Sequence, residues 1–280
     1  MAIRCWYSLV LATTLVTSPA LAGDPPINPD EEFPGNRYVK VRLALEETAL
    51  TPGKGGHLGV IFDISKDWHV YWRYAGDSGL PPRVDFKLPS GVTIGAALWP
   101  APKRHVEPGD LVDYIFENQL VLMYPITVSE GAVLGSKAAI RADVDWLVCR
   151  DVCVPGRATA TAEFGIASSS KVSPEAAIFA NARARHPVAE GRTAPYTAEW
   201  SGRNLVIKFK GARRLVFCPY ENDAGVYPDN MHRDGEVKSD TLRISYPEEV
   251  QTLKTIRGLL AVERDGKETF HEVQAAPPES

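Results

Sequence analysis

Short segments in which apolar and polar residues alternate fill most of the chain, and this pattern restricts it to folds built from β-strands. The alternation runs through Tyr38–Leu45 and returns in His57–Ile64 and Asp67–Tyr74, with the period of two that is typical of a half-buried strand. Comparable segments follow at residues 83–87, 119–127, 137–148 and 157–164. No helical period stands out before residue 170. We therefore expect an all-β protein whose first domain, residues 37–166, is an antiparallel sandwich.

A change of pattern after residue 166 indicates a connection and then a second domain. Ser173-Pro174-Glu175 combines an N-cap, a proline at the first helical position and an acid in the first turn, so we expect a helix that ends near His186, before Pro187. We interpret residues 167–195 as a helical linker. Alternating segments then return at 196–200, 205–210, 214–217, 241–246, 259–264 and 268–273. They predict a second, smaller β-sandwich domain over residues 196–275.

The first residues have the pattern of a secretory signal peptide. Arg4 precedes an apolar run, Cys5–Val16, and Ala20-Leu21-Ala22 supplies a cleavage site, which predicts a signal peptide over residues 1–22. Residues 23–36 contain four prolines and are expected to form a disordered leader. The apolar run is too short to cross a bilayer. We expect an exported, soluble protein without a membrane span of its own.

Composition and motifs exclude several classes of function. A formal net charge of −4 gives no reason to expect binding to nucleic acid or to anionic membranes. Gly-x-Ser-x-Gly, His-Glu-x-x-His and a glycine-rich phosphate loop are all missing from the sequence, which argues against common hydrolases and phosphate-binding enzymes. The six histidines are scattered. We expect no resident metal or cofactor.

The candidate chemistry lies in Cys149-Arg150-Asp151-Val152-Cys153. Four residues of extended chain would hold the two Cα atoms roughly 13 Å apart, whereas a disulfide requires less than about 7 Å, so the three residues between them must turn. Closing so small a ring stabilises the fold by only about 2 kcal/mol. A disulfide that stabilises the fold so little is expected to undergo thiol–disulfide exchange readily. A plain structural disulfide at the end of a strand remains the simplest alternative.

The residues around the pair suggest how it is exposed and covered. Alternation in strand 139–148 places Cys149 on the polar face, so we expect an exposed thiol there. Tyr71 is a candidate to face the cysteine turn, while Trp68 and Trp72 are assigned to the core. A long loop that is stiffened by proline, residues 99–108, is suited to act as a lid.

A metal site is the rival chemistry. Cys149 and Cys153, joined by Cys218 or by a histidine, could hold a soft cation such as Cu(I). The spacing is looser than that of a zinc knuckle and a second cysteine pair is missing from the sequence, so a closed zinc site is not expected. Cys218 ends an apolar segment, Val216–Cys218, and is expected to be a buried, inert thiol, although a bond to a partner is the alternative.

Five features occur in a fixed order along the first domain, namely Asp67–Trp72, Gly76–Pro81, Trp99–Pro102, Tyr114 and Trp146–Pro155. In these features the sequence resembles the N-terminal periplasmic domain of the DsbD family of thiol:disulfide interchange proteins, and specifically the suppressor-of-copper-sensitivity B branch. The resemblance covers roughly residues 36–165, and the likeness of 196–273 is fainter.

The resemblance implies an immunoglobulin-like sandwich in the periplasm that acts as a component of a protein-disulfide reductase. A redox pair, Cys149 and Cys153, would receive electrons from a membrane-embedded thiol donor and pass them to oxidised periplasmic thioredoxin-like proteins. Tyr71 and a cap containing Trp99, Pro100 and Pro102 would shield the pair. The alternative is a copper-binding protein, or a protein that binds a partner in cytochrome maturation, with a structural disulfide.

This chain departs from the family in two ways. Three residues separate the cysteines, where the best-known members have five. The membrane and thioredoxin-like domains of full-length members are absent from this sequence, so we expect either that its electrons come from a separate protein or that the function has been lost.

Overall fold

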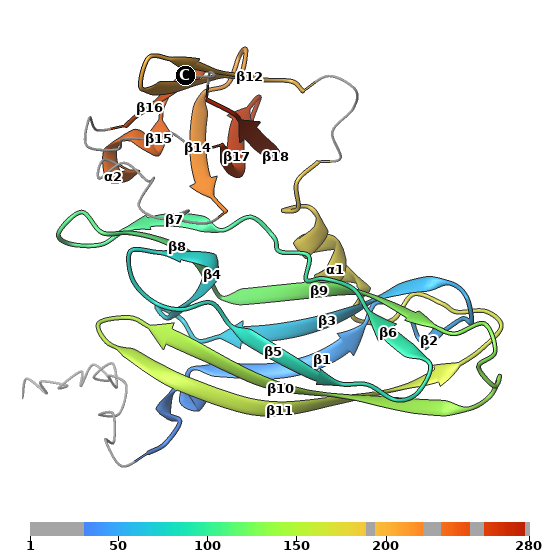
Figure 1. Ribbon diagram of the computed structural model, residues 1–280. Coiled ribbons are helices and arrows are strands. Elements are labelled where there is room, and N and C mark those ends of the chain that lie inside the picture. Colours follow the sequence, from blue (N-terminus) through green and yellow to red (C-terminus); the bar gives the residue numbers. More distant parts are fainter. Residues whose placement is uncertain (1–30, 189–193, 221–230, 247–254, 278–280) are drawn as a thin grey trace, which may run out of the picture.

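The computed structural model describes residues 31–188, 194–220, 231–246 and 255–277 (Figure 1). The predicted signal peptide, residues 23–30 of the predicted leader and residues 189–193 of the predicted linker lie outside this part of the chain. Within the described residues, no helix is both long and apolar enough to cross a membrane.

The first domain is a sandwich of two sheets. One sheet has the order β1 (Val39–Leu45), β3 (Gly55–Ile64), β9 (Gln119–Val128) and β6 (Val92–Ile94). The other has the order β2 (Ala49–Leu50), β11 (Cys153–Ile166), β10 (Lys137–Cys149), β4 (His69–Gly76), β8 (Val112–Glu117) and β7 (Lys103–Val106), with β5 (Arg83–Lys87) on the free edge of β10. All pairs are antiparallel except β2 with β11. The all-β, immunoglobulin-like class predicted from the sequence is therefore confirmed.

The alternation of the sequence decides which side chains fill the space between the two sheets. On β10 the inward-facing residues are all buried, namely Ile140, Ala142, Val144, Trp146 and Val148. Trp68 and Trp72 join the same core, as expected, and Trp68 stacks on Tyr38 with 3.7 Å between ring centroids. Burial of these large apolar side chains supplies most of the stabilisation of the sandwich.

The end of the predicted leader is ordered and belongs to the sandwich. Residues Pro34–Arg37 form a 3₁₀ turn, η1, in which Pro34 and Gly35 are buried. A Cβ on Gly35 would lie 2.7 Å from the carbonyl oxygen of Pro155, so this contact requires glycine. The prediction of disorder up to residue 36 is therefore wrong for its last residues, because they pack against β11.

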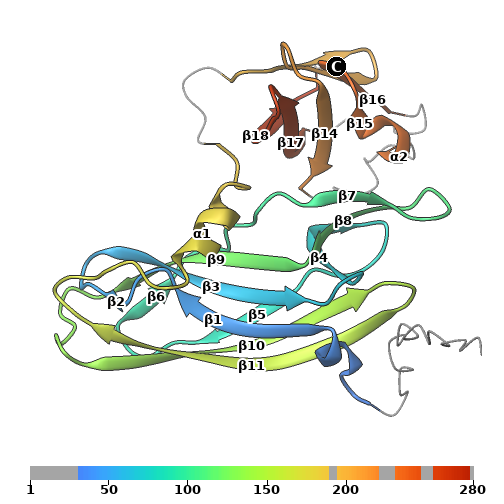
Figure 2. The same ribbon diagram turned by 180° about the vertical axis from the view of Figure 1, so that it is seen from behind.

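The linker contains the expected helix, which is shorter than predicted. Helix α1 covers Ala176–Arg183, and Ser173 accepts a hydrogen bond from the backbone of Glu175 (3.2 Å) just before it. Phe179 packs into the outer face of the sheet that contains β3 and β9, where it meets Ile61 and Met123. Figure 2 shows α1 beside this sheet. The helix is therefore docked on the first domain.

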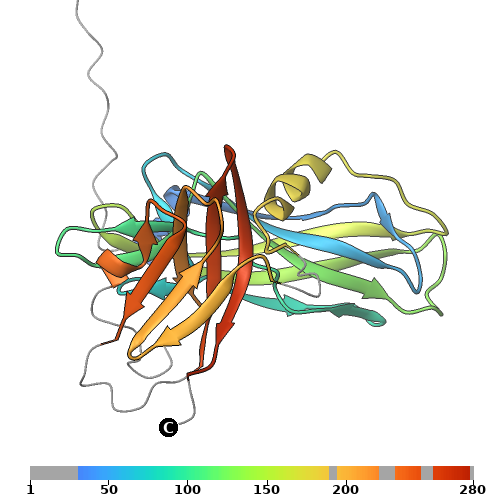
Figure 3. The ribbon, with the colours of Figure 1, turned by 90° about the horizontal axis from the view of Figure 1, so that it is seen from above.

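The second domain consists of two small sheets (Figure 3). The first contains β12 (Thr197–Ser201), β13 (Asn204–Lys208) and β16 (Thr241–Ser245), and the second β15 (Glu236–Val237), β14 (Arg214–Pro219), β17 (Ile256–Arg264) and β18 (Lys267–Ala275). A one-turn helix, α2 (Met231–Asp234), precedes β15. The sheets enclose their own apolar core, which includes Leu215, Phe217 and Leu260.

The two domains also share apolar contacts. Val216, Cys218 and Leu259 of the second domain belong to the same buried cluster as Trp72 and Tyr114 of the first. In Figures 1 and 2, β7 and β8 are the part of the first domain that faces β14. The cysteine pair belongs to the sheet that ends at β7. The second domain therefore covers the β7 edge of this sheet.

Candidate functional site

The two cysteines close the end of the long β10–β11 hairpin. They are direct partners in the antiparallel register and form a disulfide, with 4.1 Å between their Cα atoms. Arg150, Asp151 and Val152 make the turn, in which the backbone N–H of Arg150 donates to the carbonyl of Val152 (3.3 Å). The turn that the spacing required is therefore present.

The two cysteine residues differ in exposure. Cys149 is 3% exposed, whereas Cys153 is exposed at the surface of the turn. The prediction of an exposed Cys149 is wrong, although its side chain does leave β10 on the face opposite the main core. Tyr71, Ala75 and Ile115 of the neighbouring strands cover it there. An incoming thiolate would meet the sulfur of Cys153 first.

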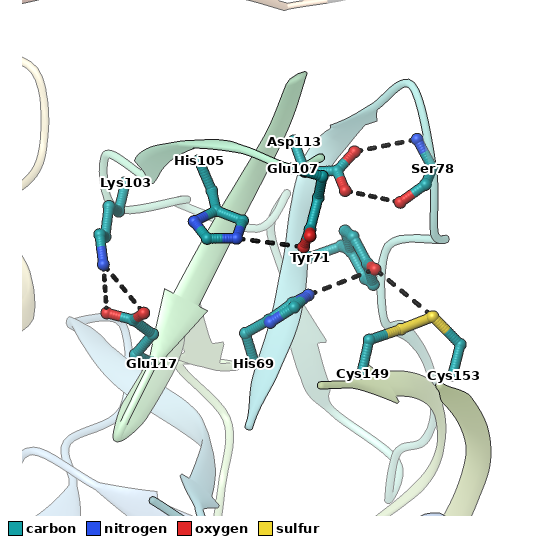
Figure 4. A network of polar contacts seen from close by, with 10 residues as sticks. All are labelled: His69, Tyr71, Ser78, Lys103, His105, Glu107, Asp113, Glu117, Cys149 and Cys153. Atoms are coloured by element: carbon teal, nitrogen blue, oxygen red, sulfur yellow. Dashed lines mark hydrogen bonds and ion pairs between the residues drawn. A yellow bond between two sulfur atoms is a disulfide. The ribbon is translucent and has the colours of Figure 1, made fainter. Parts of the chain in front are cut away.

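Tyr71 makes a direct polar contact with the disulfide. Its hydroxyl lies 3.6 Å from the Sγ atom of Cys153 and 3.3 Å from Nε2 of His69 (Figure 4). The side chain is 1% exposed. Burial raises the pKa of the Tyr71 hydroxyl, partly offset by a hydrogen bond with Ser78, so the phenol is neutral at physiological pH and can donate a hydrogen bond to sulfur.

The loop after β4 holds Tyr71 in place. Gly79 lies against the tyrosine ring, so closely that a Cβ there would be 2.1 Å from Cζ of Tyr71. Asp113, which is 0% exposed, fixes the loop by accepting hydrogen bonds from the backbone N–H (2.9 Å) and the hydroxyl (2.5 Å) of Ser78. Asp77 in turn accepts from the backbone N–H of Val112 (2.7 Å). Two carboxylates thus anchor the loop to β8.

A second group of polar side chains, His69, His105 and Glu107, lies next to Tyr71 (Figure 4). His69 is 6% exposed, and its pKa is lowered by burial and, to a smaller extent, by the charge of His105. The ring centroids of His69 and His105 are 5.8 Å apart, and His105 shares a hydrogen bond with Glu107 (3.0 Å). The buried imidazole of His69 is therefore neutral near pH 7.

The predicted cap residues lie farther along the same segment. Trp99 lines a cavity of about 450 Å³ with Trp72 and Tyr220, and Pro100 and Pro102 line another of about 410 Å³ beside α1. The backbone N–H of Ala101 donates to the carbonyl of Arg185 (2.8 Å). These residues face the linker and the second domain. Later residues of the same segment, in and after β7, bring His105 and Glu107 towards His69.

The third cysteine and the rival metal site are the two remaining features predicted from the sequence. Cys218 is a free thiol, 1% exposed, and burial raises its pKa to about 12, in agreement with a buried, inert side chain. Among the described residues, the one group of three that could hold a metal ion is Glu46, Glu47 and His57. It includes neither sulfur of the disulfide.

Three residues of the site were missed by the sequence analysis. His69 stands two residues before Tyr71 and so shares its strand face, a signal that period-two alternation could have provided. Ser78 and Asp113 are separated by 35 residues. Their contact depends on the register of β4 and β8, which the local sequence does not specify.

The comparisons with known proteins agree with this architecture. Residues 36–164 match the family model described as "Thiol:disulfide interchange protein DsbD, N-terminal". No curated protein matches the chain.

Among solved structures, the N-terminal periplasmic domain of ScsB from Proteus mirabilis is similar in fold over both domains. Its TM-score is 0.56, with 13% identity over 88% of this chain and 96% of that one. The SafA pilin–SafB chaperone complex of Salmonella enterica has a TM-score of 0.22, with 10% identity over 84% of this chain and 96% of that one. BcpA, the major pilin subunit of Bacillus cereus, has a TM-score of 0.26, with 12% identity over 85% and 67%.

The last two TM-scores are too low to bear on the fold, whereas the family match covers the sandwich that contains the disulfide, Tyr71 and the loop above it. The first domain of this chain therefore belongs to the family of the N-terminal domain of the thiol:disulfide interchange protein DsbD.

Proposed function

We propose that the protein relays electrons in the periplasm through Cys149 and Cys153. It would accept them from a membrane-embedded thiol donor and deliver them to oxidised thioredoxin-like proteins. The observation that carries this proposal is a small-ring disulfide between one exposed and one buried cysteine, in a domain of the DsbD N-terminal family. Such a pair can exchange with one partner at a time.

The difference in exposure assigns a role to each sulfur. In the reductive direction, a donor thiolate attacks Sγ of Cys153 and Cys149 leaves as a thiolate, which is then protonated. A second donor thiol resolves the mixed disulfide, so that two electrons and two protons have entered the pair. In the delivery step, the thiolate of Cys153 attacks the client disulfide, and Cys149 then attacks Cys153 to release the reduced client.

Shielding belongs to the same proposal. Tyr71 packs against Cys149 on the buried side of the disulfide, Gly79 of the loop lies against Tyr71, and β7 pairs with β8 at the edge of the same sheet. This covering would limit oxidation of the reduced pair by small molecules, while a docked partner could still reach Cys153. Trp99, Pro100 and Pro102 would support the cap from the side of the second domain.

Trapping experiments test the assignment of the two sulfurs. With Cys149→Ser, the mixed disulfide at Cys153 cannot be resolved, so we expect a covalent complex with an oxidised thioredoxin-like client on a non-reducing gel. With Cys153→Ser, the remaining thiol is buried and the complex should be at least tenfold scarcer. Equal yields from the two variants would contradict the assignment.

The reduction potential tests the function itself. We expect the mature protein, equilibrated in graded thiol buffers, to show a potential between about −120 and −230 mV, the range of exchange proteins. A value below about −300 mV would indicate a structural bond. Loss of client reduction in the double variant Cys149→Ser, Cys153→Ser, measured in the donor-coupled system, is the matching functional result. Unchanged reduction would refute the relay.

A copper-binding role remains the second candidate from the sequence, because thiolates are good ligands for Cu(I). No described histidine or carboxylate completes a group of three with the two sulfurs. Metal content after purification under reducing conditions distinguishes the two functions, and the relay predicts no stoichiometric copper.

A further inference from the structure

The described contacts form a continuous polar path from the exposed sulfur into the domain. Sγ of Cys153 lies 3.6 Å from the hydroxyl of Tyr71, which lies 3.3 Å from Nε2 of His69 (Figure 4). Both Tyr71 and His69 are more than nine-tenths buried. Shielding alone would be served by an apolar ring in place of Tyr71, and it does not require a histidine behind it.

The exchange reaction requires Cys153 to lose and regain a proton, because only a thiolate attacks a disulfide. A cysteine thiol with an ordinary pKa of about 8.5 is mostly protonated at pH 7. The site must therefore remove a proton from Cys153 before each delivery step and return one after each reductive step. Tyr71 is a polar neighbour of this sulfur, and Gly79 of the loop lies against the tyrosine ring.

We propose that Tyr71 and His69 form a proton relay for Cys153, an inference that rests on the exchange function proposed above. In the delivery step the Sγ–H of Cys153 donates its proton to the oxygen of Tyr71, and the Tyr71 O–H passes its own proton to Nε2 of His69. The products are a thiolate, a neutral tyrosine and an imidazolium. Tyr71 is the catalytic residue because it touches the reacting sulfur, and His69 is a positioning residue that acts through it.

The protons and electrons balance over the whole delivery step. The thiolate attacks the client disulfide, a new S–S bond forms and a client thiolate leaves with the electron pair of the broken bond. Cys149 then loses its proton and displaces the second client sulfur. The two protons of the dithiol, one of them held by His69, go to the two client sulfurs. Two electrons pass to the client.

The surroundings of His69 act on its charge in opposite directions. Burial, and then the charge of His105 on β7, disfavour the imidazolium and lower the pKa of His69, while Glu107, Asp113 and Glu117 favour it. His69 is also opposite Glu117 and Cys149 in the strand register. In the turn, Arg150 pairs with Asp151 at 2.8 Å. A neutral imidazole that three carboxylates can help to charge is suited to hold a proton briefly.

The test is the pH dependence of the reactivity of Cys153. In a Cys149→Ser background, alkylation by iodoacetamide is measured between pH 5 and 10, with mass spectrometry to confirm the labelled residue. We expect Tyr71→Phe and His69→Gln each to be at least about tenfold slower than the parent at pH 6.5, which corresponds to a rise of one unit in the thiol pKa. His69→Gln should also remove the lower of two inflections. His271→Gln, at a buried histidine of the second domain, is the matched control.

The relay would be overturned if the alkylation rates of both variants stayed within twofold of the parent rate at every pH. A measurement on the unaltered protein covers the case in which a variant does not fold. The imidazole of His69 is titrated by NMR in both redox states, and we expect its pKa to be higher in the reduced protein because a thiolate is then nearby. Identical titrations in the two states would also overturn the relay. Either failure leaves the measured reduction potential, and with it the exchange function, intact.

Discussion

At the scale of single residues, Gly79 packs tightly against the ring of Tyr71 beside the disulfide. Gly79 has a φ of +72°, in the left-handed region, and the ring leaves no room for a Cβ. Two independent constraints therefore require glycine at this position. The same residue that permits the turn of the loop also allows the loop to cover the tyrosine.

A comparison of Gly79→Ala with Gly266→Ala separates the effect of the positive φ from the effect of the contact with Tyr71. Gly266 also has a φ of +72°, but a Cβ there would meet nothing within 4 Å. We expect Gly266→Ala to lower the free energy of unfolding by about 1 kcal/mol from backbone strain, and Gly79→Ala by about 1–3 kcal/mol more from overlap with Tyr71. Urea unfolding measures both. Equal losses would show that the Tyr71 contact adjusts at no cost.

At the scale of elements, the loop between β4 and β5 is held by a buried carboxylate. Asp113 on β8 accepts two hydrogen bonds from Ser78. A buried charge is stable only when it is hydrogen-bonded, so the loop and the charge stabilise each other. Removing either partner should loosen the cover over Tyr71.

We expect Asp113→Ala to cost about 2–4 kcal/mol in the free energy of unfolding because both charge-assisted bonds are lost. It should also raise the rate of disulfide reduction by dithiothreitol several-fold. Ser78→Ala, the matched control, removes the hydroxyl bond and keeps the backbone bond, so smaller changes in the same directions are expected. A reduction rate that is unchanged in Asp113→Ala would contradict a covering role for the loop.

The elements also show how far the sequence could predict the structure. Strands with clear alternation, such as β1, β3 and β10, were found close to their true bounds, because one face of each is buried in the sandwich. β7 was interpreted as a loop since prolines precede and follow it. It is a strand because it pairs with β8 at the edge of the sheet.

The same distinction applies to the site. The turn between the cysteines follows from their spacing alone. The burial of Cys149 does not, because Tyr71 and Ile115 cover it from neighbouring strands. The partnership of Ser78 with Asp113 likewise depends on pairing between β4 and β8, whose register shifts between Tyr71 and Gly76.

At the scale of the whole molecule, the two domains are joined by Arg104 as well as by apolar packing. Its side chain is 5% exposed and donates to the carbonyls of Met231 (2.6 Å) and His232 (2.5 Å), with Glu236 at 3.6 Å. A buried guanidinium that reaches across an interface fixes its geometry. We therefore expect the domains to unfold together.

The substitution Arg104→Leu should lower the free energy of unfolding by about 2–4 kcal/mol, because two backbone carbonyls at the interface lose a charged donor. In calorimetry we expect the single transition of the parent to split into two. Arg233→Leu, at an exposed side chain of α2, is the control and should leave one transition. A single, unshifted transition in Arg104→Leu would show that apolar packing alone couples the domains.

The pH dependence of stability is also a property of the whole molecule. Burial lowers the pKa of His69, His186 and His271. The folded chain therefore binds fewer protons than the unfolded chain below about pH 6.5, the ordinary pKa of histidine. We expect the free energy of unfolding to fall from pH 7 to pH 5 in urea titrations, and less steeply in His271→Gln. A constant value over this range would contradict the prediction.

The register of the β10–β11 hairpin has a consequence for the lifetime of any mixed disulfide. Because Cys149 and Cys153 are direct partners in the ladder, breaking their bond leaves both strands paired up to the turn and keeps the two sulfurs within reach of each other. The resolving thiol then attacks at an effective molarity far above any partner concentration in solution. Complexes with clients should therefore exist only briefly in the native protein.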